Sequence, residues 1–163
     1  MGERDAEFTA FFRIEYPKLV RSLYLIVHDV EHARDLSQEA FIQLFDRWRR
    51  ISRYERPQAW VRRVGIRLAV RAVRRERLRP HVERELEAGA VPKPLDLDVL
   101  RAVRTLSPSQ RAAVVLFYFE DLPVEEVADA LGCTEATAKV HLHRARRRLA
   151  DLLREPLNVE GAE

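Results

Sequence analysis

The stretch "GCTEATAKVHLHRARRRLADLL", residues 132–153, begins at a glycine and continues as cationic side chains spaced by alanine and leucine. Its small and aliphatic residues recur at helical spacing, which predicts one inward-facing stripe. The stripe consists of Ala138, Leu142, Ala145, Leu149 and Leu152. The opposite side carries Ala136, Val140, His143, Arg144 and Arg147. We therefore predict a helix that begins near Thr134, packs by one side and exposes positive charge on the other.

A shorter helix is expected directly before this one, in "PVEEVADALG", opening at Pro123 and stopping at Gly132. Ala128 is a small residue where two helices would cross closely, and Gly132 suits a sharp backbone turn. Further upstream, Ser107 is expected to cap another helix, with Pro108 in its first position. The helix pair is a helix-turn-helix candidate. A second helix of this kind lies in the major groove of DNA, with its first turns near base edges and later arginines over phosphates.

Composition favours helix along the whole chain. The 163 residues are 47% apolar, include only five glycines, and show no convincing strand pattern. Pro80, Gly89, Pro92 and Pro94 mark a linker, with a short helical piece in its middle. We predict an all-α protein of two small helical domains, residues 1–79 and 96–155. A flexible linker at 80–95 joins them, and residues 156–163 form a tail.

Two helical segments are expected before residue 51. The first spans residues 5–28, and Pro17 is expected to bend or divide it. The second, residues 33–50, has an apolar face of Ala33, Leu36, Ala40, Phe41, Leu44 and Trp48. Its other face combines Asp35, Glu39 and Asp46 with Ile42. An isoleucine inside an acidic ridge indicates a protein docking surface, although a single exposed apolar side chain is common on any protein.

A third segment, residues 59–79, is expected to be a helix with one aliphatic and one cationic side. The aliphatic side is predicted to contain Val61, Val64, Gly65, Leu68 and Ala72. Arg63, Arg67, Arg74 and Arg77 are expected on the opposite side. Residues 57–84 hold nine arginines and two glutamates, and residues 134–154 hold six basic and two acidic side chains. Clustered arginine side chains favour binding to phosphate groups, because each guanidinium is permanently charged and can contact two oxygens. Two alternatives to phosphate binding remain: the charged faces are simply solvated, or the third helix lies on an anionic membrane. The membrane alternative is disfavoured because the aliphatic side of this helix lacks bulky anchoring side chains.

Other features narrow the function classes. Cys133 is the only cysteine, which excludes an internal disulfide and suits a cytoplasmic setting. No apolar run reaches the ~20 residues that span a bilayer, and the charged start is unlike a signal peptide. His28 and His32, four residues apart, could hold a metal, but no third ligand accompanies them. We expect no cofactor, no metal and no catalytic activity.

Two long stretches resemble one family. "FTAFFRIEYPKLVRSLYLIVHDVEHARDLSQEAFIQLFDRW" (8–48) follows domain two, and "LSPSQRAAVVLFYFEDLPVEEVADALGCTEATAKVHLHRARRRL" (106–149) follows domain four, of extracytoplasmic-function sigma factors. These are the smallest sigma subunits of bacterial RNA polymerase. The resemblance implies a factor that binds core polymerase, directs promoter recognition and helps open the duplex. The implied partners are promoter DNA, the clamp helices of the largest polymerase subunit, the flap of the second subunit, and an anti-sigma factor.

The resemblance also implies three sets of site residues. The polymerase-binding set is Asp35, Gln38, Glu39, Ile42 and Asp46. The minus-ten set is Trp60, Arg63, Arg67, Arg71 and Arg74 on the third helix, with Tyr54 and Arg56 in the preceding loop, where an unpaired base would stack. The minus-thirty-five set is Thr137, Lys139, Val140, His143, Arg144 and Arg147.

The chain departs from the family pattern at several contact positions. Arg67 and Arg71 stand where the family often has asparagine and a second polar residue. Ala136 replaces a usual glycine, Val140 a usual serine, and His141 a usual arginine. Base preference therefore stays open. The alternative function is a polymerase-independent helix-turn-helix regulator, binding paired half-sites as a dimer. The sequence offers no leucine-rich dimer seam for it.

Overall fold

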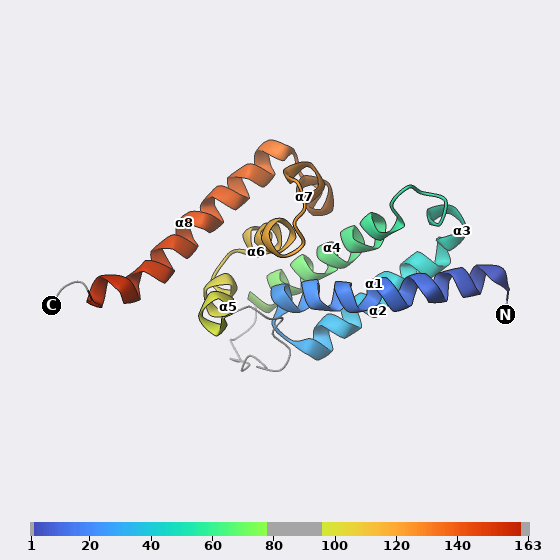
Figure 1. The fold of residues 1–163 in the computed structure, drawn as a ribbon, viewed down its shortest axis with the longest axis horizontal. Coiled ribbons are helices and arrows are strands. Elements are labelled where there is room, and N and C mark those ends of the chain that lie inside the picture. Colours follow the sequence, from blue (N-terminus) through green and yellow to red (C-terminus); the bar gives the residue numbers. More distant parts are fainter. Residues whose placement is uncertain (1, 78–95, 161–163) are drawn as a thin grey trace. The chain divides into compact units, whose positions relative to one another are not determined.

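The computed structural model describes residues 2–77 and 96–160, with side chains as far as residue 153. All regular structure in these two ranges is helical, which confirms the predicted all-α class (Figure 1). Contacts divide the chain into two compact units, Met1–Arg84 and Glu85–Glu163. The predicted linker and its short helical piece lie outside the described residues.

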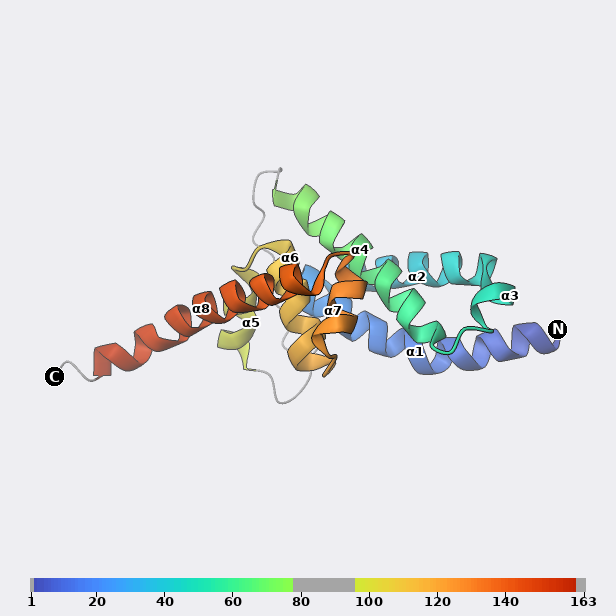
Figure 2. The ribbon, with the colours of Figure 1, turned by 90° about the horizontal axis from the view of Figure 1, so that it is seen from above.

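The first unit consists of α1 (Glu3–Val27), α2 (Val30–Asp46), α3 (Trp48–Ile51) and α4 (Pro57–Arg77). The helices α1, α2 and α4 pack against one another in all three pairings, as Figures 1 and 2 show. Leu23, Ile26, Leu44, Ile51 and Ile66 are completely or almost completely buried between them. Aromatic rings from the first half of α1 extend this core against Phe41, Phe45 and Trp48.

A short turn at His28 and Asp29 joins α1 to α2. His28 adopts a left-handed conformation with φ 58°, and its backbone N–H donates to the Tyr24 carbonyl at 2.8 Å. Asp29 then caps α2, because its carboxylate accepts the His32 backbone N–H at 3.2 Å. In the part of the chain that the structure describes, no group of three metal-ligating side chains comes together. His28 is instead buried at the end of α1.

Pro17 does not divide the first helix, which was one of the two effects that the sequence predicted. It lies inside α1, which runs without interruption from Glu3 to Val27. A proline in a helix removes one N–H donor and leaves the carbonyl four residues earlier without its usual partner. Here both Pro17 and Arg13 are exposed, so water can satisfy that carbonyl. The packing of the opposite side of α1 holds the helix together.

The second predicted segment, residues 33–50, begins and ends earlier than expected. Helix α2 ends at Asp46, and Arg47 separates it from α3. The predicted apolar face is nevertheless buried, including Trp48, which belongs to α3. Arg47 leaves the helical conformation with φ −112° and ψ 6°. The break turns the chain at Arg47, so that α3 rather than a longer α2 supplies Trp48 and Ile51 to the core.

The buried side of α4 differs from the predicted one. Val61 and Gly65 are buried as expected, but Val64, Leu68 and Ala72 are only partly buried. The core contacts come instead from Ile66, Ala69, Val70 and Val73. Apolar residues occupy nearly every angle around this helix, so its periodicity does not fix a face. Packing against both α1 and α2 rotates the buried side by roughly a quarter turn from the predicted stripe, at about 100° per residue.

The second unit contains α5 (Leu97–Arg104), α6 (Pro108–Val114), a π-helical turn η2 (Val115–Phe119), α7 (Val124–Leu131) and α8 (Glu135–Glu160). Ser107 caps α6 as predicted, accepting the Gln110 N–H at 3.3 Å. The sequence did not predict α5. It is joined to α6 by Arg111, whose buried guanidinium donates to the carbonyls of Arg104 and Leu106 at the end of α5.

Candidate nucleic-acid interface and docking ridge

The helix pair α7 and α8 has the geometry expected of a helix-turn-helix. Gly132 ends α7 in a left-handed conformation with φ 71°. The N–H groups of Gly132 and Cys133 donate to the last carbonyls of α7, at 3.1 and 3.0 Å. Thr134 then caps the N-terminus of α8, because its hydroxyl accepts the Thr137 N–H at 3.1 Å. Three residues, 132–134, therefore form the whole turn between α7 and α8.

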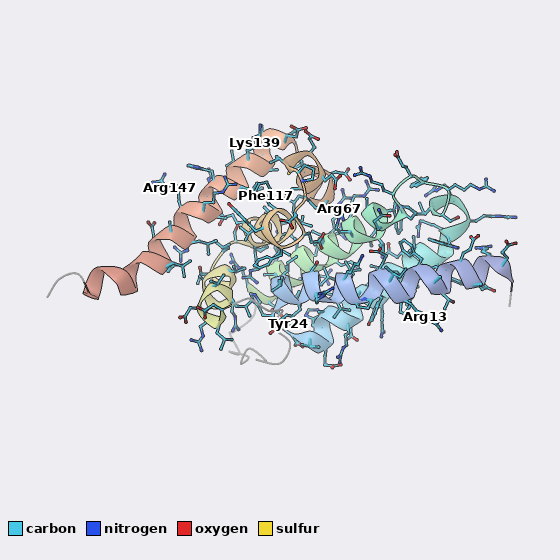
Figure 3. The ribbon with its side chains drawn as sticks, viewed as in Figure 1. Arg13, Tyr24, Arg67, Phe117, Lys139 and Arg147 are labelled. Carbon is cyan, nitrogen blue, oxygen red and sulfur yellow. The ribbon has the colours of Figure 1, made fainter. Side chains whose placement is uncertain are left out.

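Helix α8 packs by one side, as predicted. Ala138, Leu142 and Ala145 are buried, and Leu149 and Leu152 are partly buried. We call the opposite side the outer face of α8. It consists of Ala136, Thr137, Val140, His143, Arg144 and Arg147, all of which are exposed. Lys139 is exposed at its edge, and Figure 3 shows Lys139 and Arg147 projecting outward from the helix.

The two arginines of this outer face are available for a ligand. Among the residues that the structure describes, no carboxylate lies within ion-pair distance of Arg144 or Arg147. Two cationic side chains less than one helical turn apart, without an internal counter-charge, form a favourable site for phosphate. The structure thus brings together every residue of the predicted minus-thirty-five set on or beside one exposed face.

Arg146 has a different role from its neighbours, which sequence reasoning did not reveal. Its guanidinium carbon lies 5.4 Å from the Phe117 ring centroid and 5.6 Å from that of Tyr118. Its Nε–H also donates to the Tyr118 hydroxyl. In Figure 3, Phe117 lies on the side of α8 that faces α6, away from Arg147. Arg146 therefore attaches α8 to the π-helical turn of its own unit and does not belong to the outer face.

Cys133 lies in the turn between α7 and α8, where it is only partly exposed. Burial raises the pKa of its thiol. Because the thiolate is the reactive form, a raised pKa makes this cysteine a poor nucleophile at neutral pH. Its place in the turn suits a small apolar residue that packs between the two helices.

A second cationic surface lies on α4. Arg67 and Arg71, one helical turn apart, are exposed, and no carboxylate among the described residues is within ion-pair distance of either. Arg74 is also exposed, whereas Trp60 and Arg63 are partly buried. Arg63 and Arg74 each have an interaction within the chain. The predicted helical residues of the minus-ten set therefore differ in how free they are to bind.

The loop before α4 presents Tyr54 and Arg56 to solvent. Arg56 also has an interaction within the chain. The sequence did not single out Arg47, whose guanidinium carbon lies 6.0 Å from the Trp60 ring centroid. This distance is at the outer limit of a cation–π contact. Arg47 thus connects the start of α3 with the first turn of α4.

The acidic ridge on α2 consists of Asp35, Gln38, Glu39, Ile42 and Asp46, all exposed. Ile42 keeps 63% of its surface accessible. The structure adds Phe45, which is 45% exposed although its ring also packs against Phe8, with centroids 5.0 Å apart. Two large apolar side chains three residues apart make a stronger docking feature than the single isoleucine in the prediction.

Comparison with known proteins identifies both units. The family model for sigma-70 region 2 matches residues 11–79, and that for sigma-70 region 4 matches residues 96–149. The RNA polymerase sigma-E factor of Streptomyces avermitilis is 33% identical over 152 residues, covering 90% of this chain and 85% of that protein. The chain belongs to the extracytoplasmic-function group of the sigma-70 family. This sigma factor is similarly related to the sigma-E factor of Streptomyces coelicolor, with 33% identity over 94% of this chain and 89% of that protein.

A solved structure supports the fold of this sigma factor. The sigma factor RpoE from Bartonella quintana, crystallised with the anti-sigma factor NepR, matches with a TM-score of 0.71 and 23% identity. The match covers 91% of this chain and 98% of that one.

Within the described residues, no helix combines the length and apolar character needed to cross a bilayer. Family membership decides between the two functions left open by the sequence, in favour of the sigma factor over a polymerase-independent regulator.

Proposed function

We propose that this sigma factor binds core RNA polymerase through the acidic ridge of α2 and contacts promoter DNA through α4 and α8. The observation that carries the proposal is the outer face of α8, which together with Lys139 at its edge exposes the whole predicted minus-thirty-five set opposite the packed stripe. Such a face fits the major groove, with Thr137, Val140 and His143 toward base edges. Arg144 and Arg147 follow toward base edges and phosphates.

The acidic ridge has the charge of a protein-binding surface. Asp35, Glu39 and Asp46 would be repelled by DNA phosphates, so this side of α2 faces away from the duplex. Ile42 and Phe45 supply apolar area that water covers in the free chain. A polymerase element with basic and apolar side chains, the clamp helices of the largest subunit, would cover both features. The flap of the second subunit is the proposed partner of the second unit.

The proposed minus-ten contacts combine charge with stacking. Arg67, Arg71 and Arg74 lie over phosphates or base edges, and Trp60 and Arg63 flank them. Tyr54 and Arg56 hold a base taken out of the duplex, by ring stacking and guanidinium contacts. Unstacking costs a few kcal/mol per base, so contacts in the polymerase-bound state must offset it. The factor therefore assists opening without carrying out a reaction of its own.

The domain assignment follows from the same proposal. Residues 1–79 would serve polymerase and minus-ten binding, and residues 96–155 minus-thirty-five binding, with a linker at 80–95. We place the factor in the cytoplasm, where polymerase and promoter are found. RpoE of Bartonella quintana was crystallised with an anti-sigma factor, and we propose a restraining partner of this class here also.

The test is transcription by core polymerase with and without the purified factor, on a genomic promoter library. We expect a defined set of start sites that depend on the factor, and weak promoter binding by the factor alone. Glu39→Lys should abolish co-purification with core polymerase. Glu7→Lys, the same charge change at an exposed position on α1, is the control and should retain it. No stimulation from any promoter, or normal co-purification of Glu39→Lys, would refute the proposal.

A further inference from the structure

Val140 is an apolar side chain in the middle of a cationic surface. It is 44% exposed and lies at the centre of the outer face of α8, with Ala136 one turn before it and Arg144 one turn after it. Among the described side chains of α8, the only other large apolar residue that is exposed is Leu153. Leu153 lies more than three turns further along the helix, at 3.6 residues per turn.

The surroundings of Val140 do not suit a protein partner. Thr137, His143 and Arg144 share its face, and Ala136 adds only a single methyl group, so Val140 is not part of a broad apolar patch. The packing stripe of α8 is already covered by α5, α6 and α7, so Val140 has no core position to fill. An apolar side chain gains free energy only against another apolar group. In the major groove, the apolar group that a base pair presents is the C5-methyl of thymine.

We propose that Val140 contacts the C5-methyl group of a thymine in the minus-thirty-five element and so selects that base. The inference rests on the proposed placement of α8 in the major groove. Ala136 supports it, because a methyl side chain one turn earlier lets the helix approach the base edges closely. Arg144, one turn after Val140, contacts the neighbouring DNA phosphate or base. This contact fixes the position of the valine relative to the thymine.

The experiment removes the methyl group from the DNA instead of changing the base pair. On a promoter that depends on the factor, each thymine of the upstream element is replaced singly by deoxyuridine, which pairs identically but lacks the C5-methyl. Binding of the polymerase holoenzyme is measured on each DNA. At one position we expect about a fourfold loss, the factor that corresponds to returning one methyl-sized group to water.

The protein variants complete a double-mutant cycle. Val140→Ala should bind the thymine promoter several-fold more weakly and should show no further loss at the same deoxyuridine. Leu153→Ala, which shortens a comparably exposed side chain (39%) of the same helix, should keep the full dependence on the methyl group. Because Val140 is exposed, the alanine variant should fold normally, and circular dichroism checks this.

The outcomes separate the inference from the proposed function. If replacing the whole upstream element weakens binding but no deoxyuridine does, the methyl contact is refuted and the placement of α8 stands. The methyl contact is equally refuted if Val140→Ala remains sensitive to the methyl group. If replacing the whole element has no effect, the placement of α8 itself is wrong. If loss of the methyl group at one thymine weakens binding of the wild-type holoenzyme but not of Val140→Ala, both the methyl contact and the placement of α8 are supported.

Discussion

The close contact between Leu19 of α1 and Gly65 of α4 predicts the effect of one added methyl group. A β-carbon at Gly65 would lie 2.9 Å from Leu19 Cδ1, 3.1 Å from Cδ2 and 3.4 Å from Cγ. Favourable contacts between carbon atoms are about 3.5–4.0 Å long. Leu19 is buried, with 5% of its surface accessible, so its side chain has little room to move. We therefore expect Gly65→Ala to force the two helices apart.

Two opposing terms set the magnitude. Alanine is better than glycine inside a helix by about 1 kcal/mol. Overpacking a close-fitting core costs about 1–3 kcal/mol. In the wild-type background, Gly65→Ala should therefore lower the free energy of unfolding by about 0–2 kcal/mol. In a Leu19→Val background the δ carbons are gone, the overpacking term disappears, and the same substitution should stabilise by about 1 kcal/mol.

Denaturant unfolding followed by tryptophan fluorescence measures this change without interference from the second unit. Both tryptophans, Trp48 and Trp60, belong to the first unit. The four proteins of the Gly65 and Leu19 cycle are compared by their midpoints and slopes. Leu19→Val alone should cost about 1 kcal/mol and still fold. If Gly65→Ala stabilises the wild-type and Leu19→Val proteins equally, the close approach does not limit packing and the reasoning fails.

Three further predictions concern the second unit. Arg144→Ala should lose about 1–3 kcal/mol of promoter affinity and relax sequence choice, whereas Arg147→Ala should weaken all sequences alike; competition between promoter variants measures both, and identical behaviour would contradict the division. Arg146→Ala should lower the free energy of unfolding of the second unit by about 1 kcal/mol, because it loses its ring contacts and hydrogen bond, while Arg148→Ala should change it little; denaturant unfolding followed by circular dichroism measures both, since the second unit has no tryptophan. Asp121 has φ 53°, so Asp121→Val should cost about 1–2 kcal/mol and Asp121→Gly should not, as circular dichroism melting can determine.

The helix pair could be predicted from sequence because its signals are local. Gly132 stops α7, Thr134 starts α8, and the alanines and leucines of α8 repeat on one side only. Those signals lie within a few residues of one another and do not depend on the rest of the fold. The exposure of the outer face then follows from the helical period alone.

The remaining features depend on contacts between distant residues. Arg146 and Arg147 are adjacent and chemically identical, and the packing of Arg146 against Phe117 and Tyr118, far earlier in the chain, distinguishes them. Similarly, α4 is apolar at so many angles that its neighbours decide which side is buried. The eight residues of α5 are too few for a helix that is stable on its own beside a proline-rich segment. Their place depends on Arg111, a charged side chain that sequence patterns assign to the surface.

The outer face of α8 and the exposed side of α4 also differ in the contacts that they can make with DNA bases. The outer face of α8 mixes Thr137, Val140 and His143 with arginine, so it offers a donor, an apolar group and a ring to base edges. The exposed side of α4 offers arginine at positions 67 and 71, one turn apart. Phosphate contacts position a protein on DNA, whereas varied contacts with base edges specify the sequence. In the proposed arrangement, α4 therefore contributes mainly affinity that falls with salt, and α8 contributes most of the discrimination in the duplex.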